Sequence, residues 1–424
     1  MTRSAIALAA VLSGTACSAA PRDAAGPGNA VPAVPSATSS AGIPVVPRNA
    51  PAATVANIPA TTGRANRAKA APDFAVATIG QFDAPFAMAM LPDGGLLVTE
   101  KAGVLKLRFR DGDVVTVTGV PPVAAGGQGG LLDVALAPDF ATSRTVYLSF
   151  AEPGTDGSAL ALARGKLILQ PVVCVRAPCP PRAMLNGVET IWRSGMNGPG
   201  GQFGATIAFA PDGQSLFLAS GERQRFTPAQ DPEQALGKIL RLTLDGKAWP
   251  GNPQYRAGGV RAQTWSSGHR NPYGLAFAGE RLWEVEMGPK GGDEVNLIEP
   301  GRNYGWPIVS NGDNYSGQPI PDHPSRPDLA APKAWWNPSI SPGGAIVYAG
   351  TLFPAWRGSL LVAALSGEAL IRVGLNGTEA VAGEDYDMGT RIRDVAQAVD
   401  GSVWLLEDGE RGSGGKLLRL TPKQ

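Results

Sequence analysis

The sequence predicts an all-β protein, and more specifically a six-bladed β-propeller, from its composition, a recurring turn phrase and the spacing of that phrase. Of the 424 residues, 55 are glycine and 38 are proline, a usage that favours short strands joined by tight turns over long helices. From residue 73 onward, an apolar strand, a turn rich in Pro, Asp and Gly and a second apolar strand follow one another repeatedly. Such repeats are typical of propellers, in which each copy forms part of one blade.

The repeated phrase predicts hairpins, because Asp-Gly between alternating apolar runs tolerates the positive φ of a tight turn. Asp93 lies 46 residues before Asp139, about one blade length, and Asp139 lies 73 residues before Asp212. We attribute the longer spacing to an insertion around Cys174. The six copies, some of them degenerate, lie in 85–99, 132–140, 206–219, 273–283, 345–350 and 394–406. A pair of β-sandwiches is the alternative architecture.

The residues before the repeats divide into two segments. Residues 1–17 have the pattern of an export signal, with Arg3, a short apolar run and small residues before Cys17. Residues 18–72 are rich in Ala, Pro and Ser and predict a disordered tether, so that the β-propeller covers 73–424. We expect an exported protein that is periplasmic or anchored to the outer membrane through a lipid on Cys17, with plain secretion as the alternative.

Charge and cysteine usage limit the choice of partners. Lys and Arg number 37 and Asp and Glu 36, a net charge of +1, which argues against nucleic acid or an anionic membrane surface and favours a small molecule. The pair Cys174 and Cys179 lies in one short loop. In an oxidising compartment this spacing favours a local disulfide.

The polar segment from Gly268 to Trp306 is where we expect the chemistry. The only histidines are His269 and His323, which argues against a histidine-rich metal site and against a Ser-His-Asp triad. Backbone carbonyls around Gly and Pro, with Asp and Glu nearby, are hard oxygen ligands suited to Ca²⁺.

Two arginines far downstream belong to the same prediction. Arg391 and Arg393 are two residues apart in a predicted strand, so their side chains share one face. Two guanidinium groups side by side suit a ligand with several carboxylates. The alternative is that each arginine pairs with a structural aspartate.

Several spaced motifs resemble the soluble pyrroloquinoline-quinone (PQQ)-dependent sugar dehydrogenases, which include glucose, aldose and sorbosone enzymes. The motifs are Gly127-Gln-Gly-Gly-Leu-Leu-Asp, Gly268-His-Arg-Asn-Pro, Glu286-Met-Gly-Pro-Lys-Gly-Gly-Asp-Glu, Asn303-Tyr-Gly-Trp-Pro and Arg391-Ile-Arg-Asp-Val. The resemblance covers about 73–424 and implies a six-bladed, calcium-containing propeller of the bacterial periplasm.

The resemblance also implies roles for individual residues. Those that match quinone-contacting positions are Gln128, Arg270, Asn271, Arg391 and Arg393. The carbonyls of Gly288 and Pro289 match the ligands of a Ca²⁺ that sits against the cofactor, and Glu294 and Tyr304 match a second, structural calcium site, with Tyr315 a further candidate. In the family the metal polarises a quinone carbonyl while a histidine takes the sugar hydroxyl proton.

This chain departs from the family at the position of the histidine. Gln202 stands there, and an amide has no basic group that accepts a proton near neutral pH. A cofactor-contacting lysine of the family aligns with Ser366, and Met287 replaces a Gln or His. Asp133 and Glu286 are alternative bases, and the resemblance makes His269 structural.

The sequence therefore predicts oxidation of an aldose-type sugar by hydride transfer to the quinone, with a catalytic step impaired by Gln202. The partners are a small sugar and an electron acceptor that the sequence does not name, and the cofactors are PQQ and Ca²⁺. The alternative is a non-catalytic propeller that binds a sugar or a protein. A calcium-dependent lactone hydrolase is a third, weaker interpretation.

Overall fold

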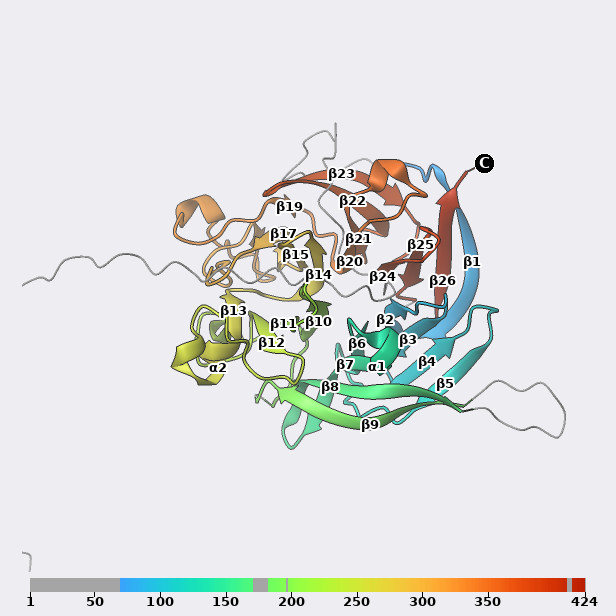
Figure 1. The fold of residues 1–424 in the computed structure, drawn as a ribbon. Coiled ribbons are helices and arrows are strands. Elements are labelled where there is room, and N and C mark those ends of the chain that lie inside the picture. Colours follow the sequence, from blue (N-terminus) through green and yellow to red (C-terminus); the bar gives the residue numbers. More distant parts are fainter. Residues whose placement is uncertain (1–68, 171–181, 196, 410–413, 424) are drawn as a thin grey trace, which may run out of the picture. The chain divides into compact units, whose positions relative to one another are not determined.

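The computed structural model describes residues 69–170, 182–195, 197–409 and 414–423. Cys17, the export signal, most of the predicted tether and the pair Cys174 and Cys179 lie outside these ranges. The regular structure of the described chain is almost entirely β-strand (Figure 1). The all-β prediction is therefore confirmed, and no helix of the described residues is long and apolar enough to cross a membrane.

Four sheets contain four antiparallel strands each. The first sheet pairs β1 (Phe74–Asp83), β26 (Gly414–Pro422), β25 (Val403–Glu407) and β24 (Ile392–Gln397) in that order. The second contains β10 (Gly204–Phe209), β11 (Ser215–Ser220), β12 (Lys238–Thr243) and β13 (Thr264–Ser267). The third contains β14 (Pro272–Ala278), β15 (Arg281–Glu286), β17 (Asp293–Ile298) and β19 (Ala334–Trp336), and the fourth β20 (Pro342–Val347), β21 (Leu360–Ala364), β22 (Ala369–Asn376) and β23 (Glu379–Asp387).

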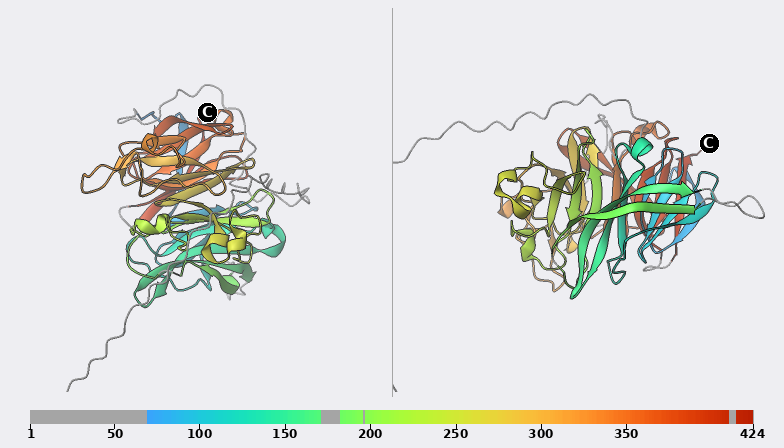
Figure 2. Two further views of the ribbon diagram at one scale, coloured as in Figure 1. Left: turned by 90° about the vertical axis from the view of Figure 1, so that its left-hand side faces the viewer. Right: turned by 60° about the horizontal axis from the view of Figure 1, so that its bottom comes forward.

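A fifth sheet has eight strands, and a two-stranded ribbon completes the set. The eight strands, in spatial order, are β2 (Pro85–Met90), β3 (Leu96–Glu100), β4 (Val104–Arg108), β5 (Val114–Thr118), β9 (Arg182–Arg193), β8 (Gly157–Gln170), β7 (Thr145–Gly154) and β6 (Leu131–Leu136). β5 and β9 are parallel and share two residue pairs, whereas β8 and β9 form a long hairpin (Figure 2). The ribbon pairs β16 (Lys290–Gly291) with β18 (Gly312–Asp313).

Helices are short and lie in connections. They are α1 (Phe140–Ser143), α2 (Gly259–Gln263) and the 3₁₀ turns η1 (Thr227–Ala229), η2 (Tyr255–Ala257), η3 (His323–Ser325) and η4 (Pro354–Trp356). The predicted turns occupy the expected places: Asp93 and Gly94 join β2 to β3, and Asp212 and Gly213 join β10 to β11. At Asp139 the chain instead enters α1 before β7.

The first strands of the repeated phrases are neighbours in space. β2, β6, β10, β14, β20 and β24 each contact the next strand of the series, and β24 contacts β2. In Figure 1 these strands lie toward the centre and the later strands of each sheet lie outside them. The apolar core fills the spaces between neighbouring sheets; Trp283 and Trp336 of the third sheet, for example, share a cluster with Val362 and Ile371 of the fourth.

Buried polar side chains join neighbouring first strands. Asp133 Oδ2 accepts the Ile207 N–H at 2.7 Å, Asp394 Oδ2 accepts the Met88 N–H at 2.8 Å, and Thr206 Oγ1 donates to the Tyr273 carbonyl at 2.7 Å. Asp133 is thus 3% exposed and occupied in joining β6 to β10.

Candidate active site

Arg270 lies at the centre of the polar segment, on the turn between β13 and β14. The turn begins at Gly268, whose φ is +76° and where a Cβ would lie 2.0 Å from Asn303 Oδ1, so only glycine fits. The Arg270 side chain is 6% exposed. Its Nη1 donates to the carbonyls of Met287 at 3.0 Å and Gly288 at 2.6 Å. The guanidinium carbon lies 5.2 Å from the Trp306 ring centre.

Gln202 is the next member of this site and connects it to two further loops, before β6 and after β11. Its backbone N–H donates to Gln128 Oε1 at 2.6 Å. With the amide oriented to satisfy both of its neighbours, Gln202 Oε1 accepts from Arg270 Nη2 at 2.8 Å and Nε2 donates to Glu222. The residue has a φ of +53°, an uncommon conformation for a side-chain-bearing residue. Gln128, Gln202 and Arg270, which are distant in the sequence, therefore form one chain of contacts.

Glu222 was not singled out from the sequence. Its Oε2 accepts the backbone N–H groups of Arg225 and Phe226, both at 2.5 Å. Burial raises the pKa of Glu222, although these N–H groups and the charge of Arg270 lower it. A carboxylate of raised pKa directly behind Gln202 is a group that can hold a proton.

Asn271 and Met287 lie next to Arg270 and contact each other. Asn271 is 1% exposed, its Oδ1 accepts the Gly204 N–H at 3.2 Å, and its Nδ2 lies 3.8 Å from Met287 Sδ. The Met287 side chain, half-buried, also packs against the core. Asn271 thus links the β14 turn to β10.

The two downstream arginines, Arg391 just before β24 and Arg393 within it, share one carboxylate. Arg391 Nε donates to Asp408 Oδ2 at 2.9 Å, and Arg393 Nη2 donates to Asp408 Oδ1 at 2.6 Å. Burial raises the pKa of Asp408, but the charges and hydrogen bonds of Arg393 and Arg391 outweigh it and the pKa is lowered. Two guanidinium groups on one carboxylate leave a surplus positive charge.

Lys101, a cation that the motifs did not indicate, adds to that charge. Its Nζ donates to the Gly127 carbonyl at 2.8 Å, one residue before Gln128. Burial and the charge of Arg393 lower the pKa of Lys101. Because Lys101 interacts with both the Gln128 loop and Arg393, it connects the two halves of the predicted site. Ser366, by contrast, is exposed and bonds to Ser341 Oγ at 2.8 Å.

The predicted calcium carbonyls lie next to Arg270. Gly288 is held by a hydrogen bond from its N–H to Asp293 Oδ1 at 2.8 Å, and a Cβ there would lie 2.3 Å from the Gly291 carbonyl oxygen. The Gly288 carbonyl accepts from Arg270, and a carbonyl oxygen has a second lone pair for a cation. Backbone oxygens of this kind fit Ca²⁺. Pro289, the other expected ligand, is buried beside it.

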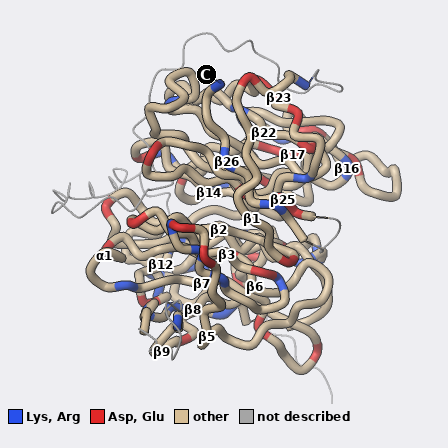
Figure 3. The backbone as a smooth tube through the Cα atoms, turned by 90° about the vertical axis from the view of Figure 1, so that its right-hand side faces the viewer, with Lys and Arg blue, Asp and Glu red and all other residues tan. Residues whose placement is uncertain are grey.

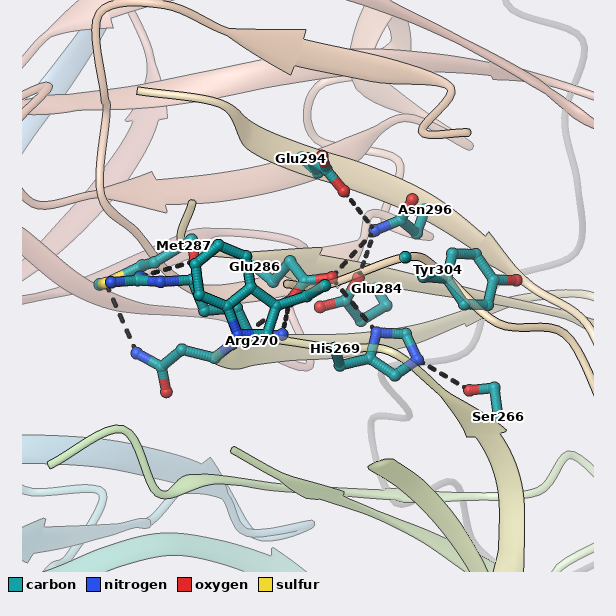
Figure 4. A network of polar contacts seen from close by, with 12 residues as sticks. Ser266, His269, Arg270, Glu284, Glu286, Met287, Glu294, Asn296 and Tyr304 are labelled. Carbon is teal, nitrogen blue, oxygen red and sulfur yellow. Dashed lines mark hydrogen bonds and ion pairs between the residues drawn. The ribbon is translucent and has the colours of Figure 1, made fainter. Parts of the chain in front are cut away.

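Three buried carboxylates surround one amide on the same sheet (Figure 4). Asn296 Nδ2 lies 3.0 Å from Glu284 Oε2, 3.3 Å from Glu286 Oε1 and 3.3 Å from Glu294 Oε2. Burial and the charge of Glu286 raise the pKa values of Glu284 and Glu294. Glu286, the alternative base, also accepts the Arg270 N–H through its Oε2 at 2.6 Å.

The two histidines lie at this carboxylate cluster. His269 Nδ1 is 3.2 Å from Glu286 Oε1 and its Nε2 is 2.9 Å from Ser266 Oγ, a fully bonded ring that agrees with the structural role. The Tyr304 hydroxyl donates to the Leu297 carbonyl, and the Tyr304 carbonyl lies 3.2 Å from His323 Nε2. Tyr315, 75% exposed, lies over Arg270 at 5.9 Å.

Comparison with known proteins places the chain among sugar dehydrogenases. The family model described as Glucose / Sorbosone dehydrogenase matches residues 82–419. Aldose sugar dehydrogenase YliI of Escherichia coli is 38% identical over 357 residues, which cover 81% of this chain and 91% of the relative. Quinoprotein glucose dehydrogenase B of Acinetobacter calcoaceticus is 28% identical over 428 residues, covering 83% and 89%.

A solved structure of an aldose sugar dehydrogenase is also similar to this chain. The PQQ-bound form of aldose sugar dehydrogenase from Streptomyces coelicolor superposes with a TM-score of 0.63 and 30% identity, covering 83% of this chain and 99% of that one. The family match and the shared fold cover the same region that holds Gln128, Arg270 and Arg393. The chain therefore belongs to the glucose/sorbosone dehydrogenase family.

Proposed function

We propose that this protein oxidises an aldose-type sugar with PQQ as cofactor. The observation that carries the proposal is the convergence of Gln128, Gln202, Arg270 and Asn271 through contacts across β10 and β14. Gln128, Arg270 and Asn271 match the family's quinone-contacting positions, and Gln202 stands at the position of the family's base. The PQQ-bound relative supports the choice of cofactor.

The fold proposed for this function is a six-bladed propeller. The ring of six first strands supports it. In this interpretation the eight-stranded sheet is two blades, β2–β5 and β6–β9, that join through the two parallel residue pairs of β5 and β9. Loops at one end of such a ring converge, which explains how residues from different sheets form one site.

The positive charge of the site suits the carboxylates of the quinone. We assign the binding of these groups to Arg391, Arg393 and Lys101, whose surplus charge Asp408 offsets only in part. Lys101 then takes the place of the family's lysine, which Ser366 does not supply. Arg270, whose guanidinium carbon lies 5.2 Å from the Trp306 ring centre, orients the ligand and supplies hydrogen bonds.

The carbonyls of Gly288 and Pro289 are the proposed ligands of a Ca²⁺ that, when bound with the quinone, supplies Lewis-acid activation of a quinone carbonyl. The chain's own residues must then take the sugar hydroxyl proton as hydride leaves the sugar carbon. Gln202 cannot take it. We assign the proton to Glu222, whose carboxylate lies against the Gln202 amide and whose pKa burial raises.

A non-catalytic binding protein is the second candidate, and the amide at Gln202 is the observation that favours it. We expect the protein to act after export, in the periplasm or on a lipid anchor at Cys17.

Reconstitution separates the two functions. The purified chain is loaded with Ca²⁺ and PQQ, quinone binding is followed by calorimetry, and dye reduction is measured over a panel of aldoses. The dehydrogenase proposal predicts quinone binding and turnover. Quinone binding without turnover of any aldose would favour the binding protein, and absence of quinone binding would overturn the assignment of the cofactor.

A further inference from the structure

A cavity with basic walls lies at β12 and β13, two neighbouring strands of the second sheet (Figure 1), and at the connection that follows β17. Its volume is about 70 Å³. Of its lining residues, Lys238 and Ser266 are buried, whereas Gln254 and Arg302 are exposed, so the cavity opens at the surface. None of the described residues that line it is assigned above to the quinone, the Ca²⁺ or the proton. The cavity is therefore separate from the proposed quinone site.

The charged side chains that line this cavity are all basic. Among the described residues they are Lys238, Arg261 and Arg302, with no Asp or Glu. Arg302 forms no side-chain hydrogen bond or ion pair with another described residue. Arg261 Nε donates to Glu233, and a guanidinium group has further N–H donors for a ligand. Such a lining attracts an anion.

Lys238 adds charge to the cavity but no free donor. Its Nζ already donates to three backbone carbonyls. Burial lowers the pKa of Lys238 to about 7, and a bound anion nearby would favour the charged ammonium. Direct contacts to an anion therefore fall to the two arginines.

The other walls suit a carbon chain that carries hydroxyl groups. The hydroxyl of Ser267, a half-buried residue, has no hydrogen bond to another described residue. Thr264 Oγ1 donates to the Val260 carbonyl at 3.0 Å, which leaves its lone pairs as acceptors. Trp265 and Pro253 supply apolar surface, as ligand pockets commonly do for a carbon skeleton. A phosphate or sulfate ion, which has no carbon, gains nothing from that surface.

The size of the cavity limits what can enter it. By volume it holds roughly five water molecules, a space that matches a carboxylate with its neighbouring carbon and hydroxyl. Because Gln254 and Arg302 are exposed, the rest of a longer molecule can extend into solvent.

We propose that this cavity binds the carboxylate end of a sugar acid. Arg302 and Arg261 donate to the carboxylate, a pairing that guanidinium groups favour. Ser267 and Thr264 bond to the hydroxyl on the neighbouring carbon. In the proposed reaction an aldose loses a hydride and a proton and becomes a lactone, which water opens to the sugar acid. The cavity thus binds the class of molecule that the enzyme forms, and this identification as a product rests on the proposed function.

Calorimetry on full-length protein without quinone tests the site and does not require turnover. The protein is titrated with gluconate, with glucose, which lacks the carboxylate, and with inorganic phosphate, which lacks the carbon chain. The site variants are Arg302→Gln and Ser267→Ala, at side chains without a hydrogen-bond partner among the described residues, so that both should fold. Arg281→Gln is the control, because Arg281 is also exposed, forms no ion pair with a described residue and lies outside the cavity.

We expect gluconate to bind wild type at a single site per chain. Its affinity should fall about 10- to 100-fold in Arg302→Gln and about 2- to 10-fold in Ser267→Ala, the ranges for a lost charge-assisted and a lost neutral hydrogen bond. In Arg281→Gln it should stay within about twofold.

Three results would each overturn the proposal: no gluconate binding, equal gluconate affinity in wild type and Arg302→Gln, or glucose or phosphate binding that is as tight as that of gluconate and depends equally on Arg302. Gluconate binding that depends on Arg302, in a protein that turns over no aldose, would support the site and contradict the proposed function.

Discussion

At the scale of single residues, the proposed function depends most on the contact between Gln202 and Glu222. The Gln202 amide is 5% exposed and lies between a guanidinium and a carboxylate. It is therefore fixed in place, and it has no basic nitrogen. A neighbouring group must therefore accept the sugar hydroxyl proton, or the oxidation is slow.

Two substitutions test this arrangement. Gln202→His should raise kcat for an aldose by about 100-fold or more, because a general base typically contributes that factor. Glu222→Gln should lower kcat of the wild-type background by a similar factor while PQQ affinity, followed by calorimetry, stays within about twofold. The exposed residue Gln254 provides the control variant Gln254→His. A Glu222→Gln enzyme with unchanged kcat would exclude the carboxylate as the proton acceptor.

Lys238 is a second residue whose environment gives a measurable result. It has no exposed surface, and its Nζ donates to the carbonyls of Pro228, Ala229 and Leu236 at 2.7, 3.0 and 2.9 Å. Burial lowers the pKa of Lys238 to about 7, while the three carbonyls favour the charged form and oppose that shift.

The sign of the pH dependence follows from the lowered pKa. Between about pH 7 and 10 the unfolded chain holds a proton on this lysine that the folded chain releases, so stability rises with pH across that window. We expect a rise of about 1–2 kcal/mol in the free energy of unfolding from pH 7 to pH 9, measured in urea and taken as the difference between wild type and Lys238→Met. A difference that is constant over this window would show that the carbonyls keep the ammonium charged.

At the scale of elements, buried aspartates join the first strands of neighbouring sheets. Asp394 of β24 accepts the Met88 N–H of β2, and a Cβ on Gly344 of β20 would lie 1.8 Å from Asp394 Oδ1. The backbone thus approaches the carboxylate so closely that glycine is required. Asp394 connects elements that are 306 residues apart.

Asp394→Asn should therefore destabilise the protein by roughly 2–3 kcal/mol, because an amide hydrogen then faces the Met88 N–H in a buried position. The measurement is the urea unfolding midpoint, with the slope checked for change. Asp156→Asn, in the exposed turn between β7 and β8, should stay within about 0.5 kcal/mol of wild type. Equal effects of the two variants would show that Asp394 does not stabilise this contact.

At the scale of the whole molecule, the two ends of the described chain belong to one sheet. β1 pairs with β26 from Phe74 opposite Pro422 to Asp83 opposite Gly414. This sheet thus contains strands from both ends of the described chain. β1 pairs with the edge of β26 that would otherwise be open. Basic and acidic residues are interspersed along the chain (Figure 3), in line with the net charge of +1.

A deletion pair tests the pairing of the ends. Removal of residues 1–83 eliminates β1 and the buried Phe74, and should lower the melting temperature by about 10 °C or cause aggregation. Removal of residues 1–68 leaves β1 intact and should leave the melting temperature within about 2 °C. If the two truncated proteins have the same melting temperature, the pairing of β1 with β26 contributes little to stability.

The sequence by itself determined the strand class and the turns at Asp93 and Asp212, and its motifs marked the residues of the proposed site. Alternating apolar runs around Asp93-Gly94 or Asp212-Gly213 encode a hairpin locally, since φ preferences and side-chain alternation act over a few residues. The motif Gly268-His-Arg-Asn-Pro, through its resemblance to the family, marked Arg270 and Asn271 as residues of the proposed cofactor site. The pairing of arginine with aspartate, one of two interpretations of Arg391 and Arg393, is what the structure contains.

Only the tertiary structure decided which distant groups meet. Glu222 and Lys101 had no local signal, because each depends on how separate sheets and connections pack. Burial, which raises the pKa values of Glu222 and Glu284, is likewise a property of the packed molecule. A sequence records which groups are available, whereas distances and desolvation, which set their chemistry, arise only when the sheets assemble.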